Sequence, residues 1–172
     1  MYKLFSKICR YLRHKMYQYL NIGVIEMESA LSAVVIRNGV RENLGVICRK
    51  KVTTAFVEYL VDNLIAETSA FGDFKFHDTG IGTTAENITD TALETPWGGA
   101  RTVGTQIEGA SANIYKSVAT TTYNATKAIT EHGLFNIAAT GILMDRFVFA
   151  AINVVDTNQI EWTCEVTVNA ET

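Results

Sequence analysis

The chain has 172 residues, 48% of them hydrophobic and 19% charged, with a formal net charge of −3. This composition predicts one domain with a buried core, extended by an arm at most, and excludes a disordered or collagen-like chain. The acidic balance argues against a globally basic nucleic-acid binder, and no run of 18 apolar residues is present to span a membrane. Three distant cysteines without a CxxC pair support neither a disulfide framework nor a four-ligand zinc site.

Residues 1–30 are predicted to form a helical, amphipathic N-terminal arm. Within residues 1–20 the basic side chains have no acidic counterpart, and apolar side chains recur at nearly helical spacing. The basic residues are Lys3, Lys7, Arg10, Arg13 and Lys15, and the apolar ones are Leu4, Phe5, Ile8, Leu12, Met16 and Leu20. Three interpretations stay open: the arm packs on its own domain or a neighbouring subunit, docks on a larger partner, or lies on a membrane surface.

Residues 31–69 are predicted to hold one or two strands and a helix that lead into the main domain. The expected strands are 31–37 and, more weakly, 44–49, and the basic cluster at 49–51 is expected in a solvated turn. Segment 53–67 is the clearest helix, with Thr53 or Thr54 as its N-cap. Its apolar stripe is predicted to pack in the core and consists of Phe56, Val57, Leu60, Val61, Leu64 and Ile65.

Residues 70–172 are predicted to form an antiparallel β-sandwich or jelly roll, so the fold class is mainly β. Short segments of alternating polar and apolar residues follow one another between glycine-containing turns. The expected strands are 73–78, 101–107, 113–123, 127–131, 142–149 and 159–168, and the expected turns are 79–82, 96–99, 132–133 and 140–141. In the last strand the alternation places Trp162 and Cys164 on the buried face, so Cys164 is predicted to be a small hydrophobe and not a nucleophile.

Few residues point to catalysis or metal binding. His77-Asp78 and Glu131-His132 each place a histidine beside a carboxylate, but neighbours on a strand face opposite sides, so a metal site at His77, Asp78 and His132 is only a minor alternative. We expect four acids to lie in solvated loops and not to form the carboxylate pair of a glycosidase: Glu86, Asp90, Glu94 and Glu108. Scattered core and rim positions, rather than a sugar-binding surface, are expected for Trp97, Tyr115 and Tyr123. We therefore expect no enzyme activity, no cofactor and no metal.

Five segments together carry a family resemblance: VTTAFVEYLVD (52–62), FKFHDTGIGTTAENITDTA (74–92), RTVGTQIEGASANIY (101–115), KAITEHGLFNIA (127–138) and LMDRFVFAAINVV (143–155). In these segments the chain resembles small structural proteins encoded in the head and tail gene modules of tailed bacteriophages. The resemblance covers about Val52 to Val168. It implies a β-rich virion component without catalytic residues, and it leaves head and tail open. Residues 1–30 fall outside it, either as an accessory arm or because Met27 lies nearer the family's usual start.

For a virion protein of this size, a capsid decoration (cement) protein on the outer head surface is the expected role. Its expected partners are the major capsid protein and further copies of itself in a homotrimer, since several weak contacts then act together. The arm would supply the contact through Lys3, Leu4, Phe5, Lys7, Ile8, Arg10 and Leu12, with the basic side chains meeting acidic shell patches. Synthesis in the host cytoplasm fits the unpaired cysteines.

Two alternatives remain. The first is a tail or fibre accessory protein whose sandwich binds a receptor or carbohydrate through loop residues such as Trp97 and Tyr115. The second is a hydrolase of host polysaccharide, which predicts paired carboxylates at a defined separation.

Overall fold

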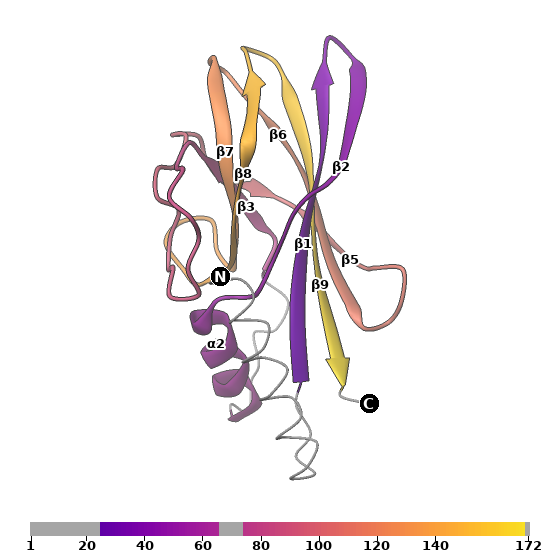
Figure 1. Ribbon diagram of the computed structural model, residues 1–172, viewed down its shortest axis with the longest axis vertical. Coiled ribbons are helices and arrows are strands. Elements are labelled where there is room, and N and C mark those ends of the chain that lie inside the picture. The colour runs from indigo at the N-terminus through magenta and orange to yellow at the C-terminus, as the bar shows by residue number, and fades with distance from the viewer. Residues whose placement is uncertain (1–24, 66–73, 171–172) are drawn as a thin grey trace, which may run out of the picture.

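The computed structural model describes residues 25–65 and 74–170, which form two antiparallel sheets and one helix (Figure 1). The five-stranded sheet has the order β2-β1-β9-β6-β5 and the four-stranded sheet the order β4-β3-β7-β8. The elements are β1 (Ile25–Arg37), β2 (Val40–Lys50), α2 (Thr54–Ile65), β3 (Phe76–Gly80), β4 (Thr102–Val103), β5 (Thr105–Glu108), β6 (Ile114–Thr122), β7 (Lys127–Phe135), β8 (Leu143–Val154) and β9 (Gln159–Ala170). The predicted mainly β, antiparallel fold is confirmed, and its two packed layers fit a β-sandwich. The jelly-roll connection stays a prediction, and the arm lies outside the described residues.

The first two strands belong to the five-stranded sheet. β1 lies between β2 and β9 and pairs with β9 from Ile25 opposite Ala170 to Ile36 opposite Gln159. The composition of the chain changes near residue 70, where we expected the sandwich to begin, but the sheet already includes residues 25–50. The basic cluster at 49–51 was expected in a turn, but Arg49 and Lys50 are the last two residues of β2.

Two glycines explain two of the wrong strand boundaries; the predicted turn 79–82 is also wrong for Thr79 and Gly80, which end β3. We expected a turn at His132-Gly133, yet both residues lie inside β7, where Gly133 pairs with Asp78 on one side and Arg146 on the other. A Cβ at this glycine would lie 2.9 Å from Leu93 and 3.0 Å from Leu143, so close packing explains it. The predicted strand 101–107 is divided at Gly104 into β4 and β5, which belong to different sheets.

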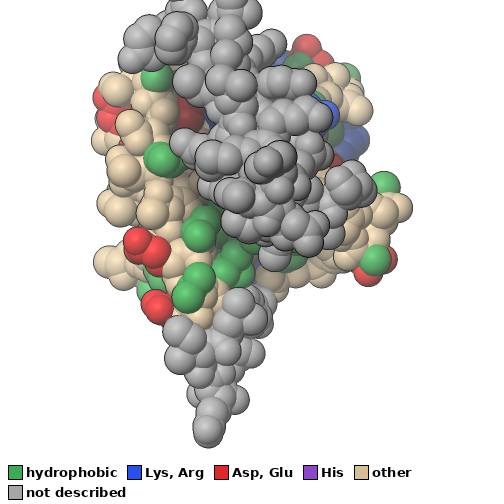
Figure 2. Space-filling view, turned by 60° about the horizontal axis from the view of Figure 1, so that its bottom comes forward, with side chains coloured by type: hydrophobic (Ala, Val, Ile, Leu, Met, Phe, Trp, Pro, Cys, Tyr) green, Lys and Arg blue, Asp and Glu red, His purple; other side chains and the backbone are tan. Residues whose placement is uncertain are grey.

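The helix α2 covers one end of the sandwich, and only part of its apolar stripe is buried. The Thr53 hydroxyl accepts the Phe56 amide N–H at 3.2 Å, which confirms the predicted cap, and the Phe56 ring meets Phe74 edge-on. Val57 and Val61 are 45% and 50% exposed, so their predicted core position is wrong. The stripe is wider than the surface that one helix side can bury. Figure 2 shows this end of the molecule, where hydrophobic side chains gather beside acidic ones. Within the described residues, no helix has the length and hydropathy needed to cross a bilayer.

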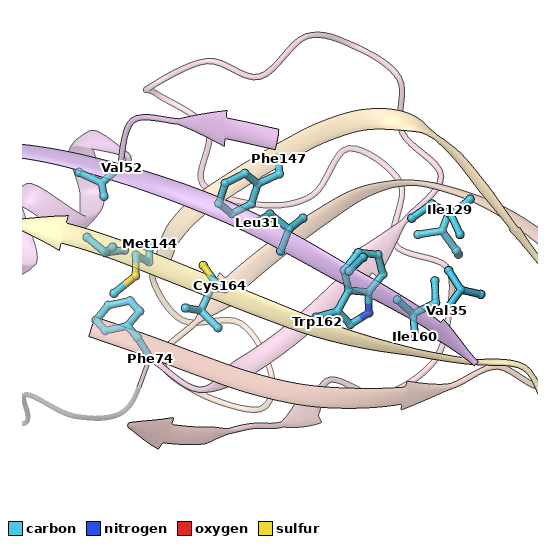
Figure 3. Close-up of a cluster of buried hydrophobic side chains, with 14 of the residues drawn as sticks. Leu31, Val35, Val52, Phe74, Ile129, Met144, Phe147, Ile160, Trp162 and Cys164 are labelled. Atoms are coloured by element: carbon cyan, nitrogen blue, oxygen red, sulfur yellow. The ribbon is translucent and has the colours of Figure 1, made fainter. Parts of the chain in front are cut away.

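The core lies between the two sheets (Figure 3). From β9, the side chains of Ile160, Trp162 and Cys164 are fully buried, which confirms the predicted alternation. Burial raises the pKa of the Cys164 thiol well above its usual value, so the group stays a neutral thiol. The residues that pack around these side chains come from both sheets and include Leu31, Val35, Ile129, Met144 and Phe147.

Candidate functional site

A polar cleft lies at the edge of the sandwich where β2 approaches β8. Its volume is about 400 Å³, and it is lined by Glu28, Ser29, Arg49, Lys50, Lys51, Thr53, Glu86, Asn87, Ile88, Asp145 and Arg146. A backbone hydrogen bond holds Thr53 beside β8, since its N–H donates to the Met144 carbonyl at 2.9 Å. Lys50 forms an ion pair with Glu86 across it. The chain therefore brings the basic cluster at 49–51 and one of the predicted loop acids to a single cleft.

Asp145 is the unusual group of this cleft. It lies on β8, its side chain is buried, and its Oδ2 accepts a hydrogen bond from the Ser29 hydroxyl. Its Oδ1 has no hydrogen-bond partner among the described residues. Burial raises the pKa of this carboxyl well above its usual value, which the Arg146 backbone N–H and the charge of Lys50 only partly offset. Folding therefore favours the protonated acid at this position.

A second polar cluster centres on Glu131 of β7, whose side chain is fully buried. Its Oε1 accepts the backbone N–H groups of Gly82 at 3.0 Å and Thr95 at 2.8 Å, and its Oε2 accepts that of Glu94 at 3.0 Å. The Arg146 Nε donates to the same Oε2 at 2.9 Å. Four donors thus compensate one buried charge, which is the condition for tolerating it in the interior.

Arg146 extends this cluster into the loop 81–101. Its Nη1 lies 3.0 Å from Asp90 Oδ2, and its Nη2 lies 3.5 Å from Glu94 Oε2 and 3.2 Å from the Thr84 carbonyl. The expectation that the loop acids are solvated is therefore wrong for Glu86 and Asp90, which are half-buried in ion pairs, whereas Glu94 is exposed as expected. Glu108 is exposed. Together these contacts fix the path of a long loop that has little secondary structure of its own.

A third cluster is the histidine pair between the sheets. The His77 Nδ1 lies 3.0 Å from the His132 Nε2, and the His77 Nε2 lies 2.8 Å from the Ser117 hydroxyl. Burial lowers the pKa of His77 to about 3 and that of His132 well below its usual value, so both rings are neutral near pH 7. Asp78 faces the other side of β3 and pairs with Arg101 at 3.1 Å, as the alternation predicted. No group of three or more His, Cys, Asp or Glu side chains in the described part of the chain could hold a metal ion.

The three candidate aromatic contacts all pack inward to some degree. Tyr123 is fully buried, and its ring centroid lies 5.0 Å from that of the half-buried Trp97. Tyr115 is also half-buried, and its hydroxyl donates to the Phe74 carbonyl. The core-and-rim interpretation is therefore confirmed for these residues, and they do not form an exposed stacking surface together.

Sequence reasoning placed several of these groups correctly but missed their connections. Asp145 and Arg146 were unassigned, although two charged residues inside the apolar run LMDRFVFA were a signal of buried polar contacts. The predicted partner-binding residues of the arm, Lys3 to Leu12, lie outside the described residues. The chain matches no protein-family model, no curated protein and no solved structure. The resemblance of residues 52–168 to phage structural proteins therefore stays a prediction.

Proposed function

We propose that this protein is a structural component of a tailed-bacteriophage virion, made in the host cytoplasm. Its role would be that of a capsid decoration protein, which binds the outside of the head shell and bridges neighbouring capsomers as a homotrimer. The β-sandwich is consistent with this role, and the resemblance of residues 52–168 is its starting point. The observation that carries the proposal is the set of exposed apolar side chains on the edge strand β2, which lie on both faces of that edge.

The strand β2 exposes apolar side chains along most of its length. Val40 and Val46 are 70% and 47% exposed, and Leu44 between them is also exposed. Within the described part of the chain, β2 pairs with β1 alone and forms the edge of the five-stranded sheet (Figure 1). Apolar groups that stay in water at the edge of a sheet favour a contact with another protein.

The backbone of β2 argues for a contact through side chains rather than through strand addition. Its register with β1 shifts between Leu31 and Ser32 and again between Ala33 and Val34. Gly45 at the second irregularity has a φ of 64°. Such bulges twist an edge away from a further strand, and Arg41 and Glu42 add charge to it. A preformed partner surface fits this edge better than an extended peptide does.

The side chains that could take part in catalysis or ligand binding instead make contacts inside the protein. Glu131 and Arg146 hold the loop 81–101, and the histidine pair lies between the sheets. The inward packing of Tyr123 and Trp97 likewise gives the carbohydrate-binding alternative less support than the decoration role.

The experiment is immunogold electron microscopy on intact virions, with an antibody against residues 74–170. The proposal predicts label scattered over the head. Label confined to the tail tip or fibres would overturn it in favour of the tail accessory role. Absence from particles in which a known virion protein labels well would contradict both roles.

A further inference from the structure

An apolar groove opens at the end of the molecule that carries α2. Its volume is about 240 Å³, and it is lined by Met27, Phe56, Leu60, Phe74, Gln106, Tyr115, Met144, Val166 and Val168. The helix forms one wall, and the ends of β1 and β9 form the other. Gln106 is the only side chain in this lining with an amide group, and the Tyr115 hydroxyl is already bonded to the Phe74 carbonyl. The groove therefore suits apolar side chains.

The outer side of α2 extends this surface. Val57 and Val61 lie one helical turn apart and are both about half exposed. Glu58 and Asp62, which follow them in the sequence, are the only charged residues of the helix and are also exposed. The groove and this helix side together present apolar groups bordered by negative charge. A segment that combines apolar with basic side chains is complementary to them.

The chain itself contains such a segment. Residues 1–20 have basic side chains but no acidic ones, and their apolar residues recur at nearly helical spacing. The segment is joined to Ile25, two residues before Met27 in the groove lining. Twenty-four residues can span up to about 80 Å when extended, so the tether does not limit access to the groove. A short tether also gives an effective concentration of the order of millimolar, which favours the same chain over a free partner.

We propose that residues 1–20 bind this groove in the same chain. Leu4, Phe5 and Ile8 would enter the groove and cover Val57 and Val61, and Lys3 and Lys7 would face Glu58 and Asp62. The proposal selects the first of the three interpretations of the arm. It goes beyond the decoration role, because it assigns the arm to the protein's own domain and leaves β2 as the surface for the shell.

The test is zero-length carbodiimide cross-linking of the full-length protein, followed by peptide mass spectrometry. Unlabelled and ¹⁵N-labelled protein are mixed in equal amounts, unfolded and refolded together, so that links between chains give mixed-isotope pairs and links within one chain join peptides of the same isotope. We expect amide links from Lys3 or Lys7 to Glu58 or Asp62 in same-isotope pairs only. The E58Q/D62N variant should lose these links, while the matched variant E42Q/E108Q, altered at exposed acids on β2 and β5, should retain them.

Two results would overturn the proposal. Links in mixed-isotope pairs would show that a second copy supplies the segment. Absence of links between these lysines and α2 in the wild-type protein, where other lysine–carboxylate pairs such as Lys116 and Glu165 do react, would show that the segment lies elsewhere.

Discussion

Two parts of this molecule treat their side chains in opposite ways. Around the loop 81–101, charged groups bind one another, and Arg146 alone contacts Glu131, Asp90 and Glu94. On β2 and on the outer side of α2, which lie apart from each other (Figure 1), apolar groups such as Val40 and Val61 face solvent. The first arrangement fixes the shape of a long loop at the cost of desolvating charge, and the second leaves hydrophobic area for binding. Substitutions around the loop should therefore affect folding, and those at exposed apolar residues of β2 and α2 should affect association.

The largest expected effect comes from removing Arg146. The R146M variant leaves the buried Glu131 carboxylate without its ionic partner, so we expect the free energy of unfolding to fall by about 3–5 kcal/mol. Urea denaturation at pH 7 measures it. The matched variant R41M breaks the exposed pair of Arg41 with Glu161, and it should cost less than about 1 kcal/mol. Equal losses in the two variants would contradict the role given to the buried cluster.

Acid should destabilise the protein through the histidine pair. The pKa of His77 is lowered from 6.5 to about 3 in the folded state, so the unfolded chain binds more protons between these values. The contribution of the neutral His77 ring to stability is therefore fully present above pH 6.5 and is lost as the pH falls toward 3. Between pH 7 and 4.5 the contribution of His77 alone should fall by about 2 kcal/mol, which denaturation of the wild type and of H77Q at several pH values measures as a difference. The H77Q variant should show a smaller slope against pH, and an unchanged slope would exclude His77 as the cause.

Asp145 should have the opposite effect to His77 on how the free energy of unfolding depends on pH. Its pKa is raised in the folded state, so the unfolded chain binds fewer protons above pH 3.8 and stability falls as the pH rises through the folded pKa. The D145N variant removes this loss and keeps an oxygen for Ser29. We expect it to be more stable than the wild type at pH 8 and nearly equal to it at pH 3. The exposed Asp156 provides the control, because D156N should change neither value.

The smallest effect on folding is expected on β2. The V40S/V46S variant should change the free energy of unfolding by less than about 0.5 kcal/mol, because both side chains already face water. In contrast, L31A on the neighbouring strand removes a fully buried side chain and should cost about 2–5 kcal/mol. A large loss in V40S/V46S would mean that β2 contributes to the core and is not a free surface.

The sequence predicted the parts of this fold that have one buried and one wet face. In β9 the alternation of Ile160, Trp162 and Cys164 with polar residues was sufficient to assign the buried side. Gly133 misled the prediction, because a glycine needed for close packing has the same sequence signal as one in a turn. The two sides of α2 could not be separated either, since Val57 and Phe56 are equally apolar and only the packed structure distinguishes them.

The polar clusters were harder to predict because their members are distant in the chain. Arg146 and Asp90 are 56 residues apart, and His77 and His132 are 55 apart. Their contacts follow from the pairing of β3, β7 and β8 and from the path of the loop 81–101, which no local pattern encodes. The doublets at His77 and His132 predicted that each histidine faces away from its neighbouring carboxylate, but not that the two rings meet.

Co-sedimentation with purified head shells of a phage that lacks this gene tests the central claim most directly. The wild-type protein should pellet with the shells, and the V40S/L44S/V46S variant should remain in the supernatant. The matched variant V103S/I107S, altered at exposed apolar residues of β4 and β5, should pellet like the wild type. Equal pelleting of the β2 variant and the wild type would contradict the assignment of β2 as the binding surface, and failure of the wild type to pellet would contradict the decoration role.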